Sequence, residues 1–176
     1  CRPFPDDSVP DIPVPGPIPA SSQSTGVVTE GSVRILLVSD LHYSLPQLDW
    51  VVAAGPSYDL VVVAGDTLDF RSTVPLDAQS EVVLNYLAMM RSGTRVVVAS
   101  GNHDLTGPDP DGEQSALWLA DGRMEGIPTD GSSLAVGDTL LTICPWWDGP
   151  AGRARVVAQL EADAVRRPRH WVWVYH

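Results

Sequence analysis

The chain has 176 residues, about the length of one domain, and its 44% hydrophobic and 19% charged residues can build a core, which argues against wholesale disorder. Unbroken apolar runs are at most five residues long, whereas a membrane-spanning helix needs about 18, so such a helix is excluded. The formal net charge of −11 disfavours non-specific binding to nucleic acid and favours cations, metal ions included. The two cysteines, Cys1 and Cys144, provide neither a disulfide framework nor a cysteine-based zinc cluster.

Residues 1–30 differ in composition from the rest of the chain. Seven of the 16 prolines fall within the first 19 residues, and proline fits neither a helix interior nor a central strand. Serine and glycine follow at 21–26, as in flexible linkers. We therefore expect a Pro/Ser-rich flexible tail over 1–30 and a folded domain over 31–176. The favoured location is the cytoplasm. The alternative is an extracytoplasmic lipoprotein anchored through Cys1, with the tail as its tether.

Strands and helices are predicted to alternate after the tail. The segments 33–39, 60–64 and 95–100 are short runs rich in valine, leucine and isoleucine, which is typical of buried strands. Helices are predicted over 48–54 and 77–91. This alternation predicts an α/β fold.

The pattern changes in the last third of the chain. The segments 134–136 and 140–144, joined by a Gly-Asp turn, predict a β-hairpin. A helix over 153–166 and a final strand over 171–175 follow. The hairpin implies either a mixed sheet or two sheets. Because both ends of the chain look cut, we expect the domain to be carboxyl-terminally incomplete.

Chemically reactive side chains follow the predicted strands at the points where they end. Sites in open α/β sheets form beyond the carboxyl ends of the strands, so these residues are expected to meet at one edge. They are Asp40 and His42 after the first strand, Asp66 and Asp69 after the second, Asn102, His103 and Asp104 after the third, and His176 after the last.

Carboxylate, imidazole and amide ligands without thiolate suit divalent ions such as Mn, Fe, Zn or Ni. Asp40 and His42 alternate in an extended loop, so both can face one ion. A central carboxylate such as Asp66 can bridge two ions about 3.5–4 Å apart. Gly65, directly before it, allows the backbone to approach closely.

The motifs Asp-Leu-His, Gly-Asp with a later Asp, Gly-Asn-His-Asp and a final Tyr-His, in this order over 33–176, resemble the calcineurin-like metallophosphoesterases. The resemblance implies two β-sheets packed together with helices outside, and hydrolysis of a phosphomonoester or phosphodiester by a metal-bridging hydroxide. It also implies residue roles: Asp40 and His42 on the first of two divalent ions, Asp66 bridging, Asn102 and His176 on the second ion, His103 as general acid or phosphate contact, and Asp104 orienting the His103 ring.

The sequence departs from this family at two places. A late Gly-His-x-His motif, which usually supplies further ligands, is absent. Some members carry an arginine that grips phosphate directly after the second Asp, where this chain has Phe70, so Arg71 receives no such role. The absent ligands support the alternative function, a catalytically weak or inactive scaffold of this fold that binds proteins, whereas the retained His103 speaks against it.

Several residues allow two interpretations. Asp69 is either a supporting partner of the site or an ordinary turn residue, and Asp104 is either the orienter of His103 or a helix cap. Trp146 and Trp147 either line a substrate cleft or pack against neighbours. The expected partner is a phosphate-ester substrate, and there is no strong signal for nucleic acid.

Overall fold

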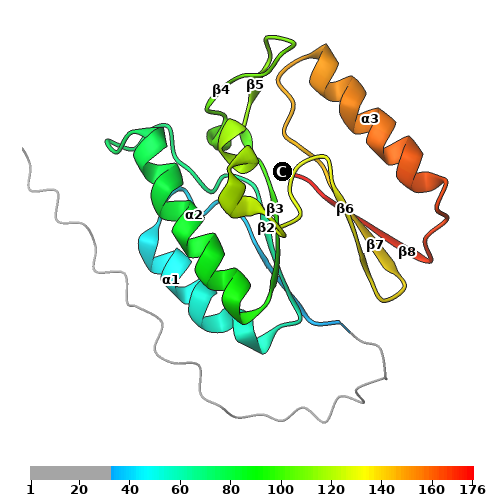
Figure 1. Cartoon of the computed structure of the whole chain (residues 1–176), viewed down its shortest axis with the longest axis horizontal. Coiled ribbons are helices and arrows are strands. Elements are labelled where there is room, and N and C mark those ends of the chain that lie inside the picture. The colour runs from blue at the N-terminus through cyan, green and yellow to red at the C-terminus, as the bar shows by residue number, and fades with distance from the viewer. Residues whose placement is uncertain (1–32) are drawn as a thin grey trace, which may run out of the picture. The chain divides into compact units, whose positions relative to one another are not determined.

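The computed structural model describes residues 33–176 (Figure 1). The predicted tail over 1–30 and the proposed anchor Cys1 lie outside the described residues. The described chain has helices and several sheets, as expected for an α/β protein.

The first sheet has three parallel strands in the order β1-β2-β3: β1 (Ile35–Val38), β2 (Leu60–Ala64) and β3 (Arg95–Ala99). All five residues of β2 are buried, because the central strand of a parallel sheet is covered on both faces. The three predicted strands are confirmed. The first is shorter than the predicted 33–39, since the backbone turns into a left-handed conformation at Asp40, where φ is 55°.

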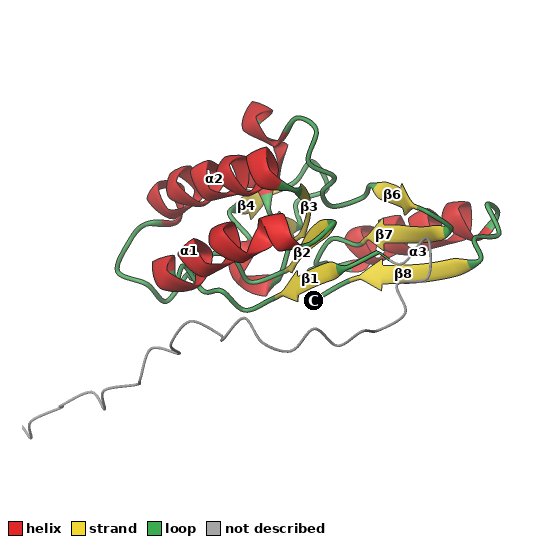
Figure 2. Cartoon of the chain, turned by 90° about the horizontal axis from the view of Figure 1, so that it is seen from below, coloured by secondary structure: helices red, strands yellow, loops and turns green. Residues whose placement is uncertain are grey.

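Helices α1 (Leu45–Ala54) and α2 (Leu76–Gly93) cover one face of this sheet (Figure 2). Alternate strand residues such as Val61 and Val63 join the helices in one hydrophobic cluster. Both predicted helices are confirmed, although α1 begins at Leu45 rather than residue 48. A proline in its first turn has no backbone N–H to leave unsatisfied there, so the helix extends to include it.

The second sheet has the order β6-β7-β8 and contains β6 (Ser133–Val136), β7 (Thr139–Ile143) and β8 (His170–Val174). Strands β6 and β7 form the predicted antiparallel hairpin, and β8 runs parallel to β7. Helix α3 (Pro150–Ala164) makes the crossover between them. It begins before the predicted residue 153, again because a proline occupies its first turn.

The two three-stranded sheets share a second hydrophobic cluster. The residues of β2 and β3 that face away from α1 and α2, such as Val62 and Val97, lie in it with Leu141 and Ile143 of β7 and Val174 of β8. This contact brings the end of β8 to the ends of β2 and β3.

The sequence patterns did not predict a short hairpin of β4 (Gly107–Pro108) and β5 (Gln114–Ser115). Each strand has only two residues, too few for a periodic pattern. Short 3-10 turns complete the described chain: η1 (Gly55–Ser57), η2 (Asn102–Asp104), η3 (Leu117–Ala120) and η4 (Gly122–Met124). Among the described residues, no helix has the length and apolar character needed to cross a membrane.

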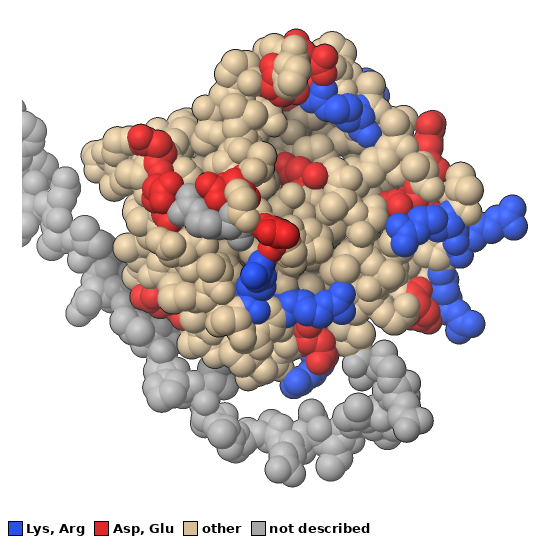
Figure 3. All heavy atoms as spheres, in the orientation of Figure 1, with Lys and Arg blue, Asp and Glu red and all other residues tan. Residues whose placement is uncertain are grey.

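Arginine side chains gather along the α3 side of the molecule (Figure 3). Two arginines of α3 and its C-terminal end are paired with carboxylates: Arg155 with Asp109 and Asp111, and Arg166 with Asp163. Part of the positive charge on this side is therefore neutralised within the domain.

Candidate metal centre

The loops that follow β1 and β2 are joined by backbone hydrogen bonds. The amide of Asp40 donates to the carbonyl of Gly65 at 3.2 Å, and the amide of His42 donates to the carbonyl of Asp66 at 2.9 Å. Tyr43 continues the series by donating to the carbonyl of Thr67 at 2.9 Å. These bonds hold the Asp-Leu-His segment against the Gly-Asp segment at the carboxyl edge of the sheet.

Backbone strain is concentrated in these loops. Asp40, His42, Tyr43 and Asp66 have φ values of 55°, 43°, 56° and 52°, in the left-handed region that L-residues seldom occupy. Each such residue costs about 1–3 kcal/mol, and strained residues of this kind cluster at functional sites. Asp and His tolerate this conformation better than most residues. The protein is therefore less stable than it would be without these strained residues, and the strained backbone orients their side chains toward the site.

Asp66 lies at the centre of the site, with only 3% of its surface exposed. Its Oδ1 atom accepts a hydrogen bond from the backbone amide of His103 at 2.9 Å. Its Oδ2 atom lies 3.8 Å from Nε2 of His42 and 3.3 Å from Nε2 of His176. One oxygen is thus used to fix the carboxylate, and the other faces two imidazoles.

His176 reaches the site from the second sheet, and the end of the chain lies near the ends of β2 and β3 in Figure 1. Its Nδ1 atom lies 3.0 Å from the carbonyl oxygen of Ala64, an acceptor, so Nδ1 carries the proton. Nε2 then has the free lone pair, and this atom faces Asp66. A backbone acceptor that fixes the tautomer in this way is the usual support of a metal-binding histidine.

Two glycines make the close approach possible. A Cβ atom on Gly65 would overlap the Cβ and ring of His176, and Gly65 also has φ of 85°. A Cβ atom on Gly101 would overlap the backbone nitrogen and carboxylate of Asp66. Any side chain at either position would push the site apart.

Asp40 is the most exposed acid of the site, with 58% of its side chain accessible. The Ser39 hydroxyl, 2.6 Å from Oδ2, is the main cause that lowers the pKa of Asp40, and the nearby histidines lower it further. Asp40 is therefore ionised at neutral pH and available to a cation.

Asp69 contacts the imidazole of His103, with Oδ1 lying 3.2 Å from Nδ1. The backbone amide of Arg71 and this imidazole together hold the pKa of Asp69 below its ordinary value. Of the two interpretations of Asp69, the structure supports the one in which it is a partner of the site.

Asp104 does not have the contact expected of it, which is a correction to the sequence analysis. Its Oδ1 atom accepts hydrogen bonds from the amides of Thr67 and Leu68 at 3.0 and 2.8 Å, and Oδ2 accepts from Gly101 at 2.8 Å. The carboxylate is fully buried, which raises its pKa to about 7 although the three amides oppose that rise. Asp104 ties the loops after β2 and β3 together, and Asp69 is the acid at the His103 ring.

The side chains that could hold ions form two groups that share Asp66. One contains His42, Asp66 and His103, and the other contains Asp40, Asp66 and His176, with the ligand atoms of each group within 4.8 Å of one another. The two side chains predicted to share an ion, Asp40 and His42, also lie close together, with Oδ1 of Asp40 3.8 Å from Nε2 of His42. Asn102, at the start of η2, is exposed beside His103. Oxygen and imidazole donors of this kind fit borderline divalent ions.

Two aromatic contacts near the site were not predicted, although Trp146 itself was considered as either a cleft or a packing residue. The ring of Phe70 stacks on His103, with centroids 4.1 Å apart. Trp146 stacks on Tyr175 and lies 6.1 Å from the His176 ring, while its amide donates to the Ser100 hydroxyl. Trp146 and Trp147 also line a cavity of about 720 Å³, so Trp146 has both packing contacts and a place beside a cavity.

A comparison with protein families gives a match to the calcineurin-like phosphoesterases over residues 33–155. No curated protein matches the chain. The matched segment includes the strand ends that carry Asp40, Asp66 and His103. The chain belongs to the calcineurin-like phosphoesterase family.

Proposed function

We propose that this calcineurin-like phosphoesterase hydrolyses phosphomonoesters or phosphodiesters with two divalent ions, and that its ligands are Asp40, His42, Asp66, Asn102 and His176. The observation that supports the proposal best is the position of Asp66, whose Oδ2 atom lies 3.8 Å from Nε2 of His42 and 3.3 Å from Nε2 of His176, two of the proposed ligands. One buried carboxylate shared by two ligand groups is the arrangement that a dinuclear centre requires.

The proposed domain comprises residues 31–176. It extends beyond the matched segment because His176 contributes to one of the two groups. The Ala64 carbonyl fixes the His176 tautomer, and the amide of His103 fixes the Asp66 carboxylate. Because these partners hold the ligands before any ion binds, little ordering is needed on binding.

Two divalent ions held there would supply an activated water and neutralise the charge of the phosphoryl oxygens. His103 is the proposed general acid or phosphate contact. Asp69 holds Nδ1 of His103, so the charged imidazole would carry a second proton on Nε2, and this is the proton that can be given to the departing oxygen. Asp104 keeps its place in the proposal as a positioning residue, because it ties the loop of Asp66 to the loop of His103.

The proposal is tested with protein stripped of metal by a chelator and then titrated with Mn, Fe, Zn or Ni ions. Calorimetry is expected to give two ions per chain, and hydrolysis of 4-nitrophenyl phosphate or bis(4-nitrophenyl) phosphate is expected to appear only with metal. The ratio of the two rates decides between monoester and diester. Metal binding without hydrolysis of either ester would favour the scaffold alternative instead.

A further inference from the structure

His103 is held from three directions. Asp69 lies at Nδ1, 3.2 Å away, and the ring of His42 approaches edge-on with centroids 4.5 Å apart and an interplanar angle of 80°. The ring of Phe70 stacks on a face of the imidazole, with centroids 4.1 Å apart and planes inclined by 29°. Nε2 is the ring atom left for a reacting group.

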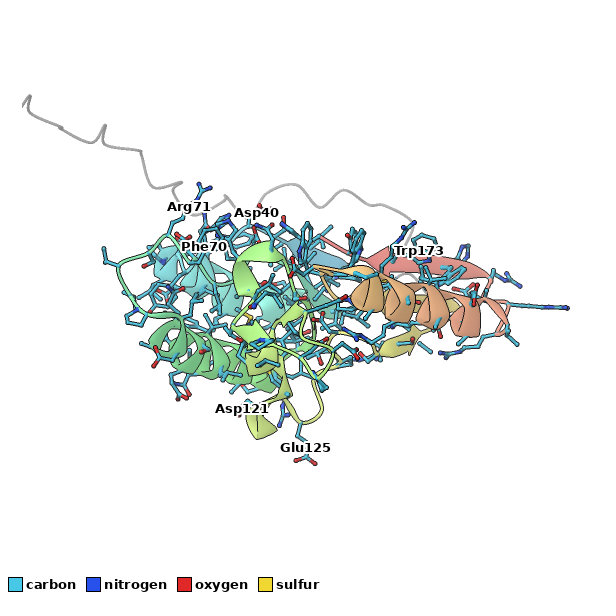
Figure 4. All side chains as sticks on the ribbon, turned by 90° about the horizontal axis from the view of Figure 1, so that it is seen from above. Asp40, Phe70, Arg71, Asp121, Glu125 and Trp173 are labelled. Atoms are coloured by element: carbon cyan, nitrogen blue, oxygen red, sulfur yellow. The ribbon has the colours of Figure 1, made fainter. Side chains whose placement is uncertain are left out.

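The exposure of Phe70 is not explained by packing in the core. Its surface is 53% exposed, and it belongs to neither hydrophobic cluster. Phe70 and Arg71 lie on the same side of the molecule as Asp40 (Figure 4). The guanidinium of Arg71 lies 5.7 Å from the centre of the Phe70 ring, within the range of a cation–π contact. The Phe70 ring therefore lies at the surface beside the site, in contact with His103 and Arg71.

The turn that carries Phe70 is anchored to helix α2. The amide of Asp69 donates to Oε1 of Gln79 at 2.8 Å, and Nε2 of Gln79 donates to the carbonyls of Asp69 and Val74 at 2.9 and 2.7 Å. Gln79 is fully buried. The Asp69 carboxylate also accepts from the amide of Arg71 at 2.9 Å. A buried side chain thus fixes the backbone on which both Asp69 and Phe70 stand.

We propose that Phe70 is a positioning residue that holds the imidazole of His103 in the orientation needed for proton transfer, an inference that rests on the proposed function. The hydrogen bond to Asp69 fixes only the Nδ1 atom, so the plane of the imidazole could still tilt about that hydrogen bond. A ring stacked on the face of the imidazole opposes this tilt. The face of Phe70 also excludes water from one side of the imidazole.

Substrates with different leaving groups separate this role from a structural one. A 4-nitrophenolate leaves without help, whereas the phenolate of phenyl phosphate needs a proton. We expect Phe70→Ala to lower kcat for phenyl phosphate about tenfold, part of the roughly 100-fold or more that general acids contribute. The rate for 4-nitrophenyl phosphate should stay within about twofold of the wild type. Phe70→Tyr keeps an aromatic ring and should therefore have both rates of the wild type. Trp50→Ala, which removes a half-exposed ring from α1, should change neither rate. Equal losses on the two esters would overturn the proposal and leave the proposed function standing.

The orientation of His103 is also measurable without metal or turnover. With four histidines in the chain, the ring protons of His103 can be assigned by NMR, and stacking on Phe70 should shift them upfield. Phe70→Leu should abolish this shift while Trp50→Ala retains it. Unchanged His103 resonances in Phe70→Leu would refute the stacking. A wild-type protein inert on these two monoesters and on bis(4-nitrophenyl) phosphate would refute the proposed function, and the resonances would still decide whether Phe70 holds the ring.

Discussion

The Nε2 atom of His176 lies 3.3 Å from Oδ2 of Asp66, although the two residues follow strands of different sheets. The Ala64 carbonyl, at the end of β2, accepts the Nδ1 proton of His176. The last strand is therefore joined to the first sheet both through the hydrophobic cluster that the sheets share and through this one imidazole. Asp66 therefore links the loop after β2 to the residue that follows β8.

Replacing Asp66 with Asn keeps the shape of the side chain and removes the charge that two ligand groups share. We expect Asp66→Asn to lose at least one of the two bound ions and to reduce metal-dependent turnover by about 100-fold or more. Calorimetry with Mn²⁺ and hydrolysis of the nitrophenyl esters measure both effects. The control is Asp138→Asn, whose carboxylate is exposed on the β6–β7 turn, and it should behave like the wild type. Full activity in Asp66→Asn would refute the proposed centre.

Position 101 has room only for glycine, since a Cβ atom there would overlap Asp66. Gly101→Ala should lower the free energy of unfolding by about 1–3 kcal/mol, as overpacking does, and should weaken metal binding more than the loss of stability alone explains. Urea denaturation and calorimetry provide the two values. Gly122→Ala is the matched control, because its added Cβ meets no atom within 4 Å. Metal affinity equal to that of the control would show that the loops adjust without cost.

Asp163 joins α3 to the second sheet. Its Oδ2 accepts hydrogen bonds from the hydroxyls of Ser133 and Thr142 at 2.5 and 2.6 Å, and Arg166 lies 3.2 Å from Oδ1. Burial raises the pKa of Asp163, but these three partners outweigh burial and hold the pKa below its ordinary value. Asp163→Asn should therefore cost about 1–3 kcal/mol of unfolding free energy near pH 7.

The sign of the pH dependence at Asp163 follows from its lowered pKa. The unfolded state takes up a proton first, so the stabilisation is complete above the ordinary pKa of 3.8 and is lost as the pH falls through the lower folded value. Urea denaturation of wild type and Asp163→Asn between neutral and acidic pH should show the two curves converging. Glu161→Gln on the exposed part of α3 is the control. A constant difference at all pH values would contradict the assignment.

Asp130 should show the opposite dependence. Its carboxylate accepts the Ser100 amide at 2.9 Å, and burial raises its pKa to about 6 in spite of the bonds from Ser100. The folded state keeps the proton longer than the unfolded state, so stability falls as the pH rises from about 4 to about 6. We expect a loss of about 1–3 kcal/mol over this interval, absent in Asp130→Asn. The same slope in both proteins would assign it to another group.

The sequence predicted the elements of the fold well where composition and period act locally. Valine- and leucine-rich runs such as 60–64 are strands because β-branched and apolar side chains fill a sheet covered on both faces. The errors lie at the amino-terminal ends of two helices. Helix α1 begins at Leu45 and helix α3 at Pro150, earlier than predicted, because a proline in the first turn lengthens each helix. The two-residue strands of the β4–β5 hairpin are too short for any period to be detected.

The partner of His103 illustrates where prediction from sequence stops. The resemblance to the metallophosphoesterases implied that Asp104 orients the imidazole, and Asp69 was left as either a partner of the site or a turn residue. The short turn η2 instead directs Asp104 inward to three backbone amides, where a buried carboxylate is satisfied. Asp69, in the loop after the neighbouring strand β2, is the acid that contacts the imidazole. The stack of Phe70 on His103 depends on the same placement.

By itself, the sequence determined which side chains stand at the strand ends, because apolar runs of strand length and the polar residues after them are local properties. Only the tertiary structure decided which of these side chains meet. That choice depends on strained left-handed residues, on the space left by Gly65 and Gly101, and on the second sheet that carries His176. These are contacts between segments distant in the chain, and their geometry is set by packing, which no local pattern encodes.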